Sequence, residues 1–188
     1  MTDMRDQILE NAQGLIQTSG YNGFSFRDIA SNIGIKSSSI HYYYPSKTHL
    51  AVAAIAKYRS DFMQVVTQLR SKKKKATTIL KSYAGLFQET LECEDRLCLA
   101  GMLASELNSV EEEVRTEIKA FFSEQRDFLT DVITEGQSNG EIRAELQAAH
   151  FAKTYLAALE GAMMLARTQQ DPSDILLVSR QLIASIKT

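Results

Sequence analysis

Apolar residues recur at the spacing of an α-helix along almost the whole chain. Between residues 4 and 19 they stand three and four positions apart, on one helical face: Ile8, Leu9, Ala12, Leu15 and Ile16. The same period predicts helices over residues 25–33, 37–44, 47–69, 77–91, 96–107, 109–138, 146–170 and from 173 onward. Two prolines and nine glycines in 188 residues leave little sequence for long loops. The pattern therefore predicts an all-α fold of about nine helices.

The helices predicted at 96–107 and 109–138 have start signals, and a lysine-rich run precedes the helix at 77–91. Asp95 is expected to cap the helix at 96–107, and Ser109 with Glu112 has the spacing of a capping box for the next helix. The run Ser71–Lys75 (SKKKK) is predicted to be a solvated connector, with a supporting electrostatic role near a polyanion as the alternative.

Signals for two short helices and a tight turn are concentrated in the stretch Ser25–Lys47, SFRDIASNIGIKSSSIHYYYPSK. Ser25 and Asp28 have the spacing of a capping box at a helix entrance. Gly34 stands where a helix end commonly needs a left-handed residue. Ser37–Ser39 offer caps for the second short helix, which Pro45 stops. Helix, glycine turn and short helix form the helix-turn-helix pattern, whose second helix enters the major groove of DNA.

The second short helix has a polar outward face. If Ile40 points into the core, the helical period puts Ser38 and Tyr42 on the opposite side, with Ser39 and His41 on the flanks. Hydroxyl, phenol and imidazole groups suit base edges and phosphates. A solvated surface helix rich in serine is the alternative, although such a helix does not need three consecutive tyrosines. The face therefore favours DNA binding.

This stretch resembles the DNA-binding signature of the TetR family of bacterial transcriptional regulators. The matching positions are Ser25, Ile29-Ala30, Gly34-Ile35, the HYYY run of His41–Tyr44, and Ser46-Lys47. The resemblance implies a three-helix DNA-binding domain over residues 1–47, with the motif at about 25–44, and a larger helical effector-binding and dimerisation domain over 48–188. The candidate DNA-contacting residues are Ser25, Arg27, Lys36, Ser37, Ser38, Ser39, His41, Tyr42, Tyr43 and Lys47.

Two of these candidates are cations in the first turns of their helices. A cation there opposes the helix dipole unless an anion lies beyond the N-terminus, and for Lys47 a DNA phosphate would be that anion. Arg27 lies near the groove in the resembled family. Its alternative is a surface ion pair with Asp28 or Asp3.

Charge is distributed unevenly along the chain, which is close to neutral as a whole. Residues 1–75 carry 11 Lys and Arg against 5 Asp and Glu, whereas residues 76–188 carry 10 against 18. Only the N-terminal part is therefore suited to a polyanion.

The C-terminal part carries aromatic and thioether side chains on inward stripes, with a few polar groups among them. Ligand pockets combine apolar walls with a few polar anchors, and the resembled family binds its effector between these helices. We therefore expect a small, largely apolar or aromatic effector, with simple filling of the core as the alternative. The candidate effector-binding residues are Phe87, Met102, Phe121, Gln125, Phe128, Tyr155 and Met163.

Small residues form a ridge on the helix at 146–170, and the last helix is strongly apolar. Such ridges allow two helices to approach closely, and the resembled family dimerises through its last two long helices. Packing within one chain is the alternative. The candidate residues of a homodimer interface are Ala158, Gly161, Ala162 and Leu182.

The sequence contains none of the common catalytic or metal-binding motifs. It has no phosphate-binding loop, dinucleotide fingerprint, HExxH or nucleophile–base pair, so we expect no enzyme activity, cofactor or metal. Cys93 and Cys98 have neither a redox nor a zinc-knuckle spacing. No apolar run is long enough to span a bilayer and the N-terminus is not a signal peptide, which predicts a cytoplasmic protein without membrane contact.

The function expected from these features is ligand-responsive transcriptional regulation. A homodimer would repress by binding a roughly palindromic operator, and an effector would release it. One alternative is a DNA-binding regulator without small-molecule input, controlled by thiol oxidation or a protein partner. Another is a helical enzyme that carries a helix-turn-helix, against which the missing catalytic residues argue.

Overall fold

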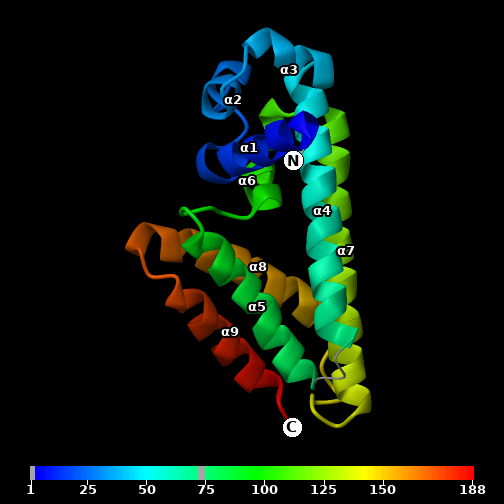
Figure 1. The fold of residues 1–188 in the computed structure, drawn as a ribbon. Coiled ribbons are helices and arrows are strands. Elements are labelled where there is room, and N and C mark those ends of the chain that lie inside the picture. The colour runs from blue at the N-terminus through cyan, green and yellow to red at the C-terminus, as the bar shows by residue number, and fades with distance from the viewer. Residues whose placement is uncertain (1–2, 72–74) are drawn as a thin grey trace. The chain divides into compact units, whose positions relative to one another are not determined.

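The computed structural model describes residues 3–71 and 75–188, which form nine α-helices (Figure 1). The predicted all-α class is confirmed. Residues 72–74 of the predicted lysine-rich connector lie outside the described residues. The helices are α1 (Met4–Ser19), α2 (Phe26–Ile33), α3 (Ser37–Tyr43), α4 (Lys47–Ser71), α5 (Ala76–Glu92), α6 (Leu99–Ser105), α7 (Glu112–Ser138), α8 (Ala148–Gln169) and α9 (Ser173–Ile186), with a 3-10 turn, η1, at Leu107–Ser109.

The chain divides into two compact units. Unit 1 takes in the residues up to Asp61 together with Cys98–Phe121, and unit 2 takes in Phe62–Leu97 and Phe122–Thr188. The long helices α4 and α7 therefore each contribute residues to both units. This division differs from a boundary after Lys47 because α6 and the start of α7 join the N-terminal helices. The division of functions between 1–47 and 48–188 stays a prediction.

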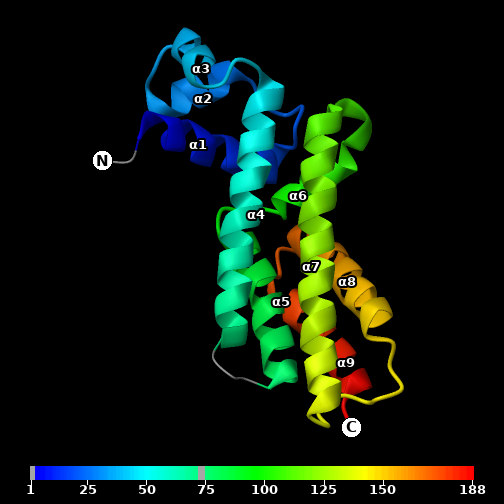
Figure 2. The same cartoon turned by 90° about the vertical axis from the view of Figure 1, so that its right-hand side faces the viewer.

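Unit 1 is built around the apolar stripe of its first helix. α1 contacts both α2 and α6, and α2 contacts α3 (Figure 2). Gln13 ties α1 to α4 by donating from Nε2 to the carbonyl oxygen of Ala54 at 2.9 Å. The side chains that are fully buried here include Ile8, Ala12, Ile16, Ile29, Ile40 and Leu50.

Two predicted helix starts are wrong. Asp95 has φ = 59° and caps no helix, because α6 begins only at Leu99 and the Asp95 carboxylate pairs with Arg167 at 3.1 Å. Ser109 ends the 3-10 turn, and the extended Val110 follows with its side chain buried. α7 then begins at Glu112, so burial of one valine overrides the local capping pattern.

Helices α5, α8 and α9 pack against one another in unit 2, and Figure 1 shows α9 (red) running alongside α5 (green). The buried Tyr155 on α8 links all three, because its hydroxyl donates to the Leu80 carbonyl at 2.9 Å and lies 2.6 Å from the Ser179 hydroxyl. Arg143 holds the C-terminal end of α9 by donating from its guanidinium to the Ser185 carbonyl at 2.6 Å.

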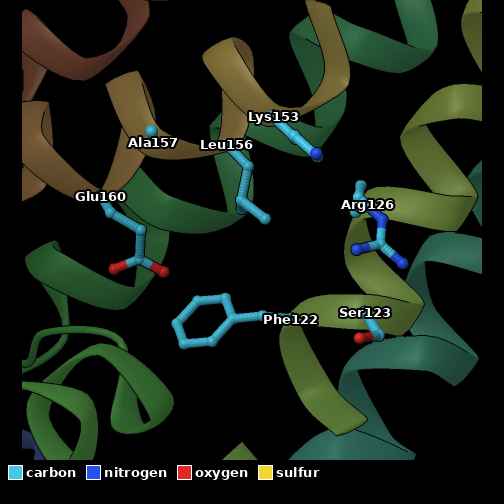
Figure 3. Close-up of a pocket in the computed structure, with 7 residues that line it drawn as sticks. All are labelled: Phe122, Ser123, Arg126, Lys153, Leu156, Ala157 and Glu160. Atoms are coloured by element: carbon cyan, nitrogen blue, oxygen red, sulfur yellow. The ribbon is translucent and has the colours of Figure 1, made fainter. Parts of the chain in front are cut away.

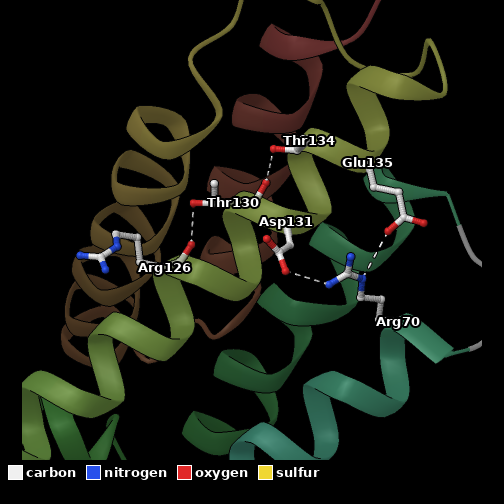
Figure 4. Close-up of polar contacts among 6 residues, drawn as sticks. All are labelled: Arg70, Arg126, Thr130, Asp131, Thr134 and Glu135. Atoms are coloured by element: carbon white, nitrogen blue, oxygen red, sulfur yellow. Dashed lines mark hydrogen bonds and ion pairs between the residues drawn. The ribbon is translucent and has the colours of Figure 1, made fainter.

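The last turn of α4 is joined to α7 within unit 2 by one arginine (Figure 4). Arg70 contacts Asp131 at 3.1 Å and Glu135 at 3.3 Å. Thr130 and Thr134 donate to helix carbonyls four residues earlier, which satisfies their hydroxyls locally. None of the helices in residues 3–71 and 75–188 combines the length and the apolar character needed to cross a bilayer.

Candidate nucleic-acid interface

The first short helix, α2, and the turn after it have the geometry that their sequence predicts. Gly34 ends α2 in the left-handed region at φ = 72°, and the Ile35 amide donates to the Ala30 carbonyl at 3.0 Å. At the other end of α2, the Ser25 amide and hydroxyl both donate to Asp28 Oδ2 at 2.7 Å. Hydrogen bonds from Ser25 lower the pKa of the Asp28 carboxyl below its usual value.

The outward face of α3 is also as predicted. Ile40 is fully buried, whereas Ser38 and Ser39 are exposed and Tyr42 is 85% exposed. The serines themselves are wrongly predicted as caps, because Lys36 holds the N-cap position and α3 already includes Ser37. The exposed phenol of Tyr42 offers both an aromatic ring and a hydroxyl to a partner.

Two aromatic contacts hold the flanks of this face. The rings of Phe26 on α2 and His41 on α3 meet edge to face at 4.9 Å between centroids, and His41 Nδ1 lies 3.3 Å from the Pro45 carbonyl oxygen. Tyr42 and Tyr43 also meet edge to face, at 5.1 Å. The recognition surface is therefore braced by side chains of its own motif.

Three candidate cations lie in different surroundings. Arg27 is exposed, and no ion pair among the described residues joins it to Asp28 or Asp3. Lys36 is exposed at the start of α3. Lys47 instead donates from Nζ to the Phe24 carbonyl and lies over aromatic rings, 4.2 Å from the centroid of Phe24 and 4.8 Å from that of Tyr21. Its contact with a phosphate stays a prediction that would require the ammonium to leave these partners.

The environment of Lys47 changes its acidity and that of its neighbour. Burial lowers the pKa of Lys47, and the nearby carboxylates Glu106, Asp28 and Glu111 oppose that shift. Burial also raises the pKa of the Tyr21 phenol, whose hydroxyl donates to Glu111 at 3.0 Å. These groups form one network inside unit 1.

Glu106 fastens the loop between α1 and α2, a role that sequence reasoning missed. Its carboxylate accepts from the Tyr21 amide at 2.7 Å, the Asn22 amide at 3.1 Å and the Asn22 side chain at 2.6 Å. A Cβ on Gly20 would lie 2.0 Å from Glu106 Oε1, and Gly20 has φ = 79°. The close approach and the backbone therefore both require glycine at this position.

The predicted effector-binding residues are divided between the two units. Met102 and Phe121 belong to unit 1, whereas the other five belong to unit 2. In unit 2 the fully buried Gln125 accepts from the Tyr83 hydroxyl at 3.3 Å and donates to the Met63 sulfur at 3.2 Å. The Tyr83 ring stacks against Phe128 at 6.1 Å. Packed side chains surround Gln125, and its role in effector binding stays a prediction.

A cavity of about 320 Å³ lies between α7 and α8 in unit 2 (Figure 3). None of the seven predicted effector residues lines it. Its walls are formed by Phe122, Ser123, Arg126, Lys153, Leu156, Ala157 and Glu160. The sequence signal for this site is the set of cationic and apolar residues one helical turn apart on each helix, which an analysis of inward stripes alone overlooks.

The predicted dimer residues lie partly on the surface of α8 and α9. Ala158, Gly161 and Leu182 are half-buried, whereas Ala162 is 5% exposed and faces the interior of unit 2. The exposed apolar side chains nearby in sequence were missed: Met164, Leu165 and Leu177. No group of three or more potential metal ligands occurs in the parts of the chain that the structure describes.

Two family descriptions match the chain. "Bacterial regulatory proteins, tetR family" matches residues 8–54, and "Tetracyclin repressor-like, C-terminal domain" matches residues 82–182, more than half of the chain. The first match contains the whole helix-turn-helix, and the second contains the cavity between α7 and α8.

Solved structures and a curated relative are similar over most of the chain. A TetR-family transcriptional regulator from Agrobacterium tumefaciens is 30% identical with a TM-score of 0.93, covering 98% of this chain and 97% of that one. A TetR transcriptional regulator from Legionella pneumophila is 31% identical with a TM-score of 0.90, covering 100% and 99%. The transcriptional repressor DhaR of a Mycobacterium species is 24% identical, covering 90% of this chain and 85% of DhaR. These names describe transcriptional regulators and not enzymes.

Proposed function

The chain belongs to the TetR family of bacterial transcriptional regulators, and from that membership we propose that it is a ligand-responsive repressor. It binds a roughly palindromic operator as a homodimer. A small, largely apolar or aromatic effector binds its C-terminal helices and releases it from DNA.

The observation that carries the DNA-binding proposal is the exposed face of α3. Tyr42, Ser38 and Ser39 point outward from a helix whose opposite side, at Ile40, is fully buried. A helix fixed in this way presents one defined set of donors and acceptors to the major groove. Lys36 and Arg27, both exposed, supply the positive charge that phosphate contacts require.

Dimerisation is supported by the apolar surface of the last two helices. Leu165 and Met164 on α8 are 63% and 51% exposed, and Leu177 on α9 is 47% exposed. A two-fold dimer would bury these side chains and present two copies of α3 to half-sites about one helical turn of DNA apart. The repressor name of the relative DhaR supports repression over activation.

The test of this function begins with selection of bound sequences from a random double-stranded DNA library. We expect an inverted repeat, and binding to it should weaken in Ser38→Ala and Tyr42→Ala. Ser60→Ala is the matched control for Ser38→Ala, because Ser60 is also exposed but lies on α4. Recovery of no preferred sequence, or equal binding by Tyr42→Ala and wild type, would contradict the assignment of α3 as the recognition helix.

Effector control requires a second measurement. A compound that stabilises the protein in a thermal-shift screen should also release operator DNA. Because binding free energies are reciprocal, operator DNA must weaken its binding by the same factor. If an oxidant releases operator DNA and none of the screened compounds does, control through thiol oxidation is favoured. Of the two thiols, Cys93 is exposed and Cys98 is buried.

A further inference from the structure

The cavity between α7 and α8 has cationic side chains at one end and an anionic side chain at the other. Figure 3 shows Arg126 and Lys153 reaching toward the same end from opposite helices, with Glu160 at the far end. Phe122 and Leu156 lie between them. The site is therefore polarised along its length.

The cationic end is suited to bind an anion. Two like charges that face each other across a small space repel, and an anion between them relieves that repulsion. Arg126 donates from Nε and from one terminal nitrogen to Asp127 Oδ1, at 3.1 and 2.9 Å. A guanidinium has five N–H donors in all, so the others stay available for a ligand. Lys153, which is exposed, adds an ammonium.

The middle of the cavity is suited to an apolar group. The half-buried Phe122 and the buried Leu156 form its walls, and Ala157 leaves room beside them. The volume of about 320 Å³ is near the lower end of the range of about 300–1,000 Å³ for ligand sites, so the part of a ligand that the site holds is compact.

Glu160 adds a carboxylate at the far end of the cavity. A molecule with a second carboxylate at its other end would place that group near the carboxylate of Glu160, where like charges repel. The same molecule with a single carboxylate avoids this contact. We therefore expect a monocarboxylate to be preferred over a dicarboxylate.

We propose that this cavity binds a compact monocarboxylate with an apolar or aromatic body, the carboxylate between Arg126 and Lys153 and the body on Phe122 and Leu156. The identification of this molecule as the effector rests on the ligand-responsive function proposed above, whereas the binding site itself does not. The site differs from the packed cluster around Gln125.

The test is isothermal titration calorimetry of the full chain with three probes of similar size. These are 3-phenylpropanoate, the neutral 3-phenylpropan-1-ol and the dicarboxylate 1,4-phenylenediacetate. We expect the monocarboxylate to bind at least about tenfold more tightly than either of the others, a factor that corresponds to about 1.4 kcal/mol. Equal binding of acid and alcohol, or no binding of the acid, overturns the proposal.

Three substitutions in the cavity and one control outside it locate the site. Arg126→Gln and Lys153→Gln should each weaken the binding of 3-phenylpropanoate about tenfold. Lys81 is exposed on α5 and does not line the cavity, so Lys81→Gln should leave this affinity unchanged. Glu160→Gln should bring the dicarboxylate close to the monocarboxylate in affinity. If Arg126→Gln does not fold, the affinity of Lys153→Gln still tests the site, because Lys153 is exposed and its substitution should not affect folding. Retention of full affinity in Lys153→Gln places the ligand elsewhere and overturns the proposal.

Operator release is measured separately in a gel shift with the same probes. Binding that needs Arg126 and Lys153 but releases no DNA supports the site and contradicts the proposed effector control. If a compound releases operator DNA and its binding is unchanged by substitution of Arg126 or Lys153, the result supports effector control and overturns the site proposed here.

Discussion

Removal of the Glu106 carboxylate should loosen the loop that leads into the helix-turn-helix. Three donors of Tyr21 and Asn22 converge on this one carboxylate, at 2.6–3.1 Å. α2 begins at Phe26 with Ser25 as its N-cap, only three residues beyond Asn22. The substitution Glu106→Ala therefore removes the fixed point from which α2 is positioned.

The expected loss of stability follows from the exposure of the three donors. The Tyr21 amide is partly buried and has no other acceptor when Glu106 is removed, which costs about 1–2 kcal/mol. The two Asn22 donors are exposed and regain water, so each contributes only about 0.5 kcal/mol. The total of about 2–3 kcal/mol corresponds to a fall in Tm of about 5–10 °C for a chain of this size.

The assay combines thermal unfolding with amide hydrogen exchange. Glu106→Ala should lower Tm, remove the protection of the Tyr21 and Asn22 amides, and weaken operator binding; Glu106→Gln, which keeps one acceptor, should lose about half as much stability. Glu89→Ala is the matched control, because Glu89 is exposed on α5. If Glu106→Ala matches Glu89→Ala in Tm and in the exchange of both amides, the carboxylate does not hold the loop.

Charge, capping and the surface of α8 each give a further prediction. Lys36→Ala should reduce the salt dependence of DNA binding by about one unit. Gel shifts at several salt concentrations measure this change, and an unchanged salt dependence would contradict a phosphate contact at Lys36. The pKa of Asp28 is lower in the folded chain than in the unfolded one, so its contribution to stability is complete above the unfolded pKa and is lost as pH falls through the folded pKa. The Tm of Asp28→Asn should therefore fall less than the Tm of wild type when pH is lowered from about 5 to about 2. An equal fall in both proteins would contradict a stabilising role of the ionised Asp28 carboxylate. Gly161→Leu should weaken the dimer in sedimentation without unfolding the chain, because no atom lies within 4 Å of a Cβ built there; an unchanged dimer would place the interface elsewhere.

Local sequence was sufficient to predict the helix-turn-helix. Its determinants lie within a few residues of one another, as with Gly34 at the end of α2 or Ile40 and Tyr42 on opposite sides of α3. Helical periodicity alone then decides which side chains face outward. Interactions between neighbours in sequence are the ones that a single sequence displays directly.

Helix starts were predicted less well because distant packing decides them. Asp95 has the residue type of a cap, yet it pairs with Arg167 and takes a left-handed conformation instead. Likewise, none of the residues chosen for their place on inward stripes lines the cavity between α7 and α8. Residue type shows which side chains can line a pocket, whereas only the fold shows which of them meet.

Lys47 shows how a sound electrostatic argument can leave the partner of a charge undetermined. A cation in the first turn of a helix requires a compensating group, and DNA phosphate is one solution. The chain contains another, in which the ammonium donates to the Phe24 carbonyl and lies over the Tyr21 and Phe24 rings. The carboxylates of Glu106 and Glu111 support it from about sixty residues away in the sequence. Both arrangements compensate the ammonium of Lys47, so its charge and its position in the helix do not distinguish them. The salt dependence of DNA binding by Lys47→Ala does. A reduction of about one unit indicates a phosphate contact, whereas an unchanged salt dependence with a lower Tm indicates the internal partners.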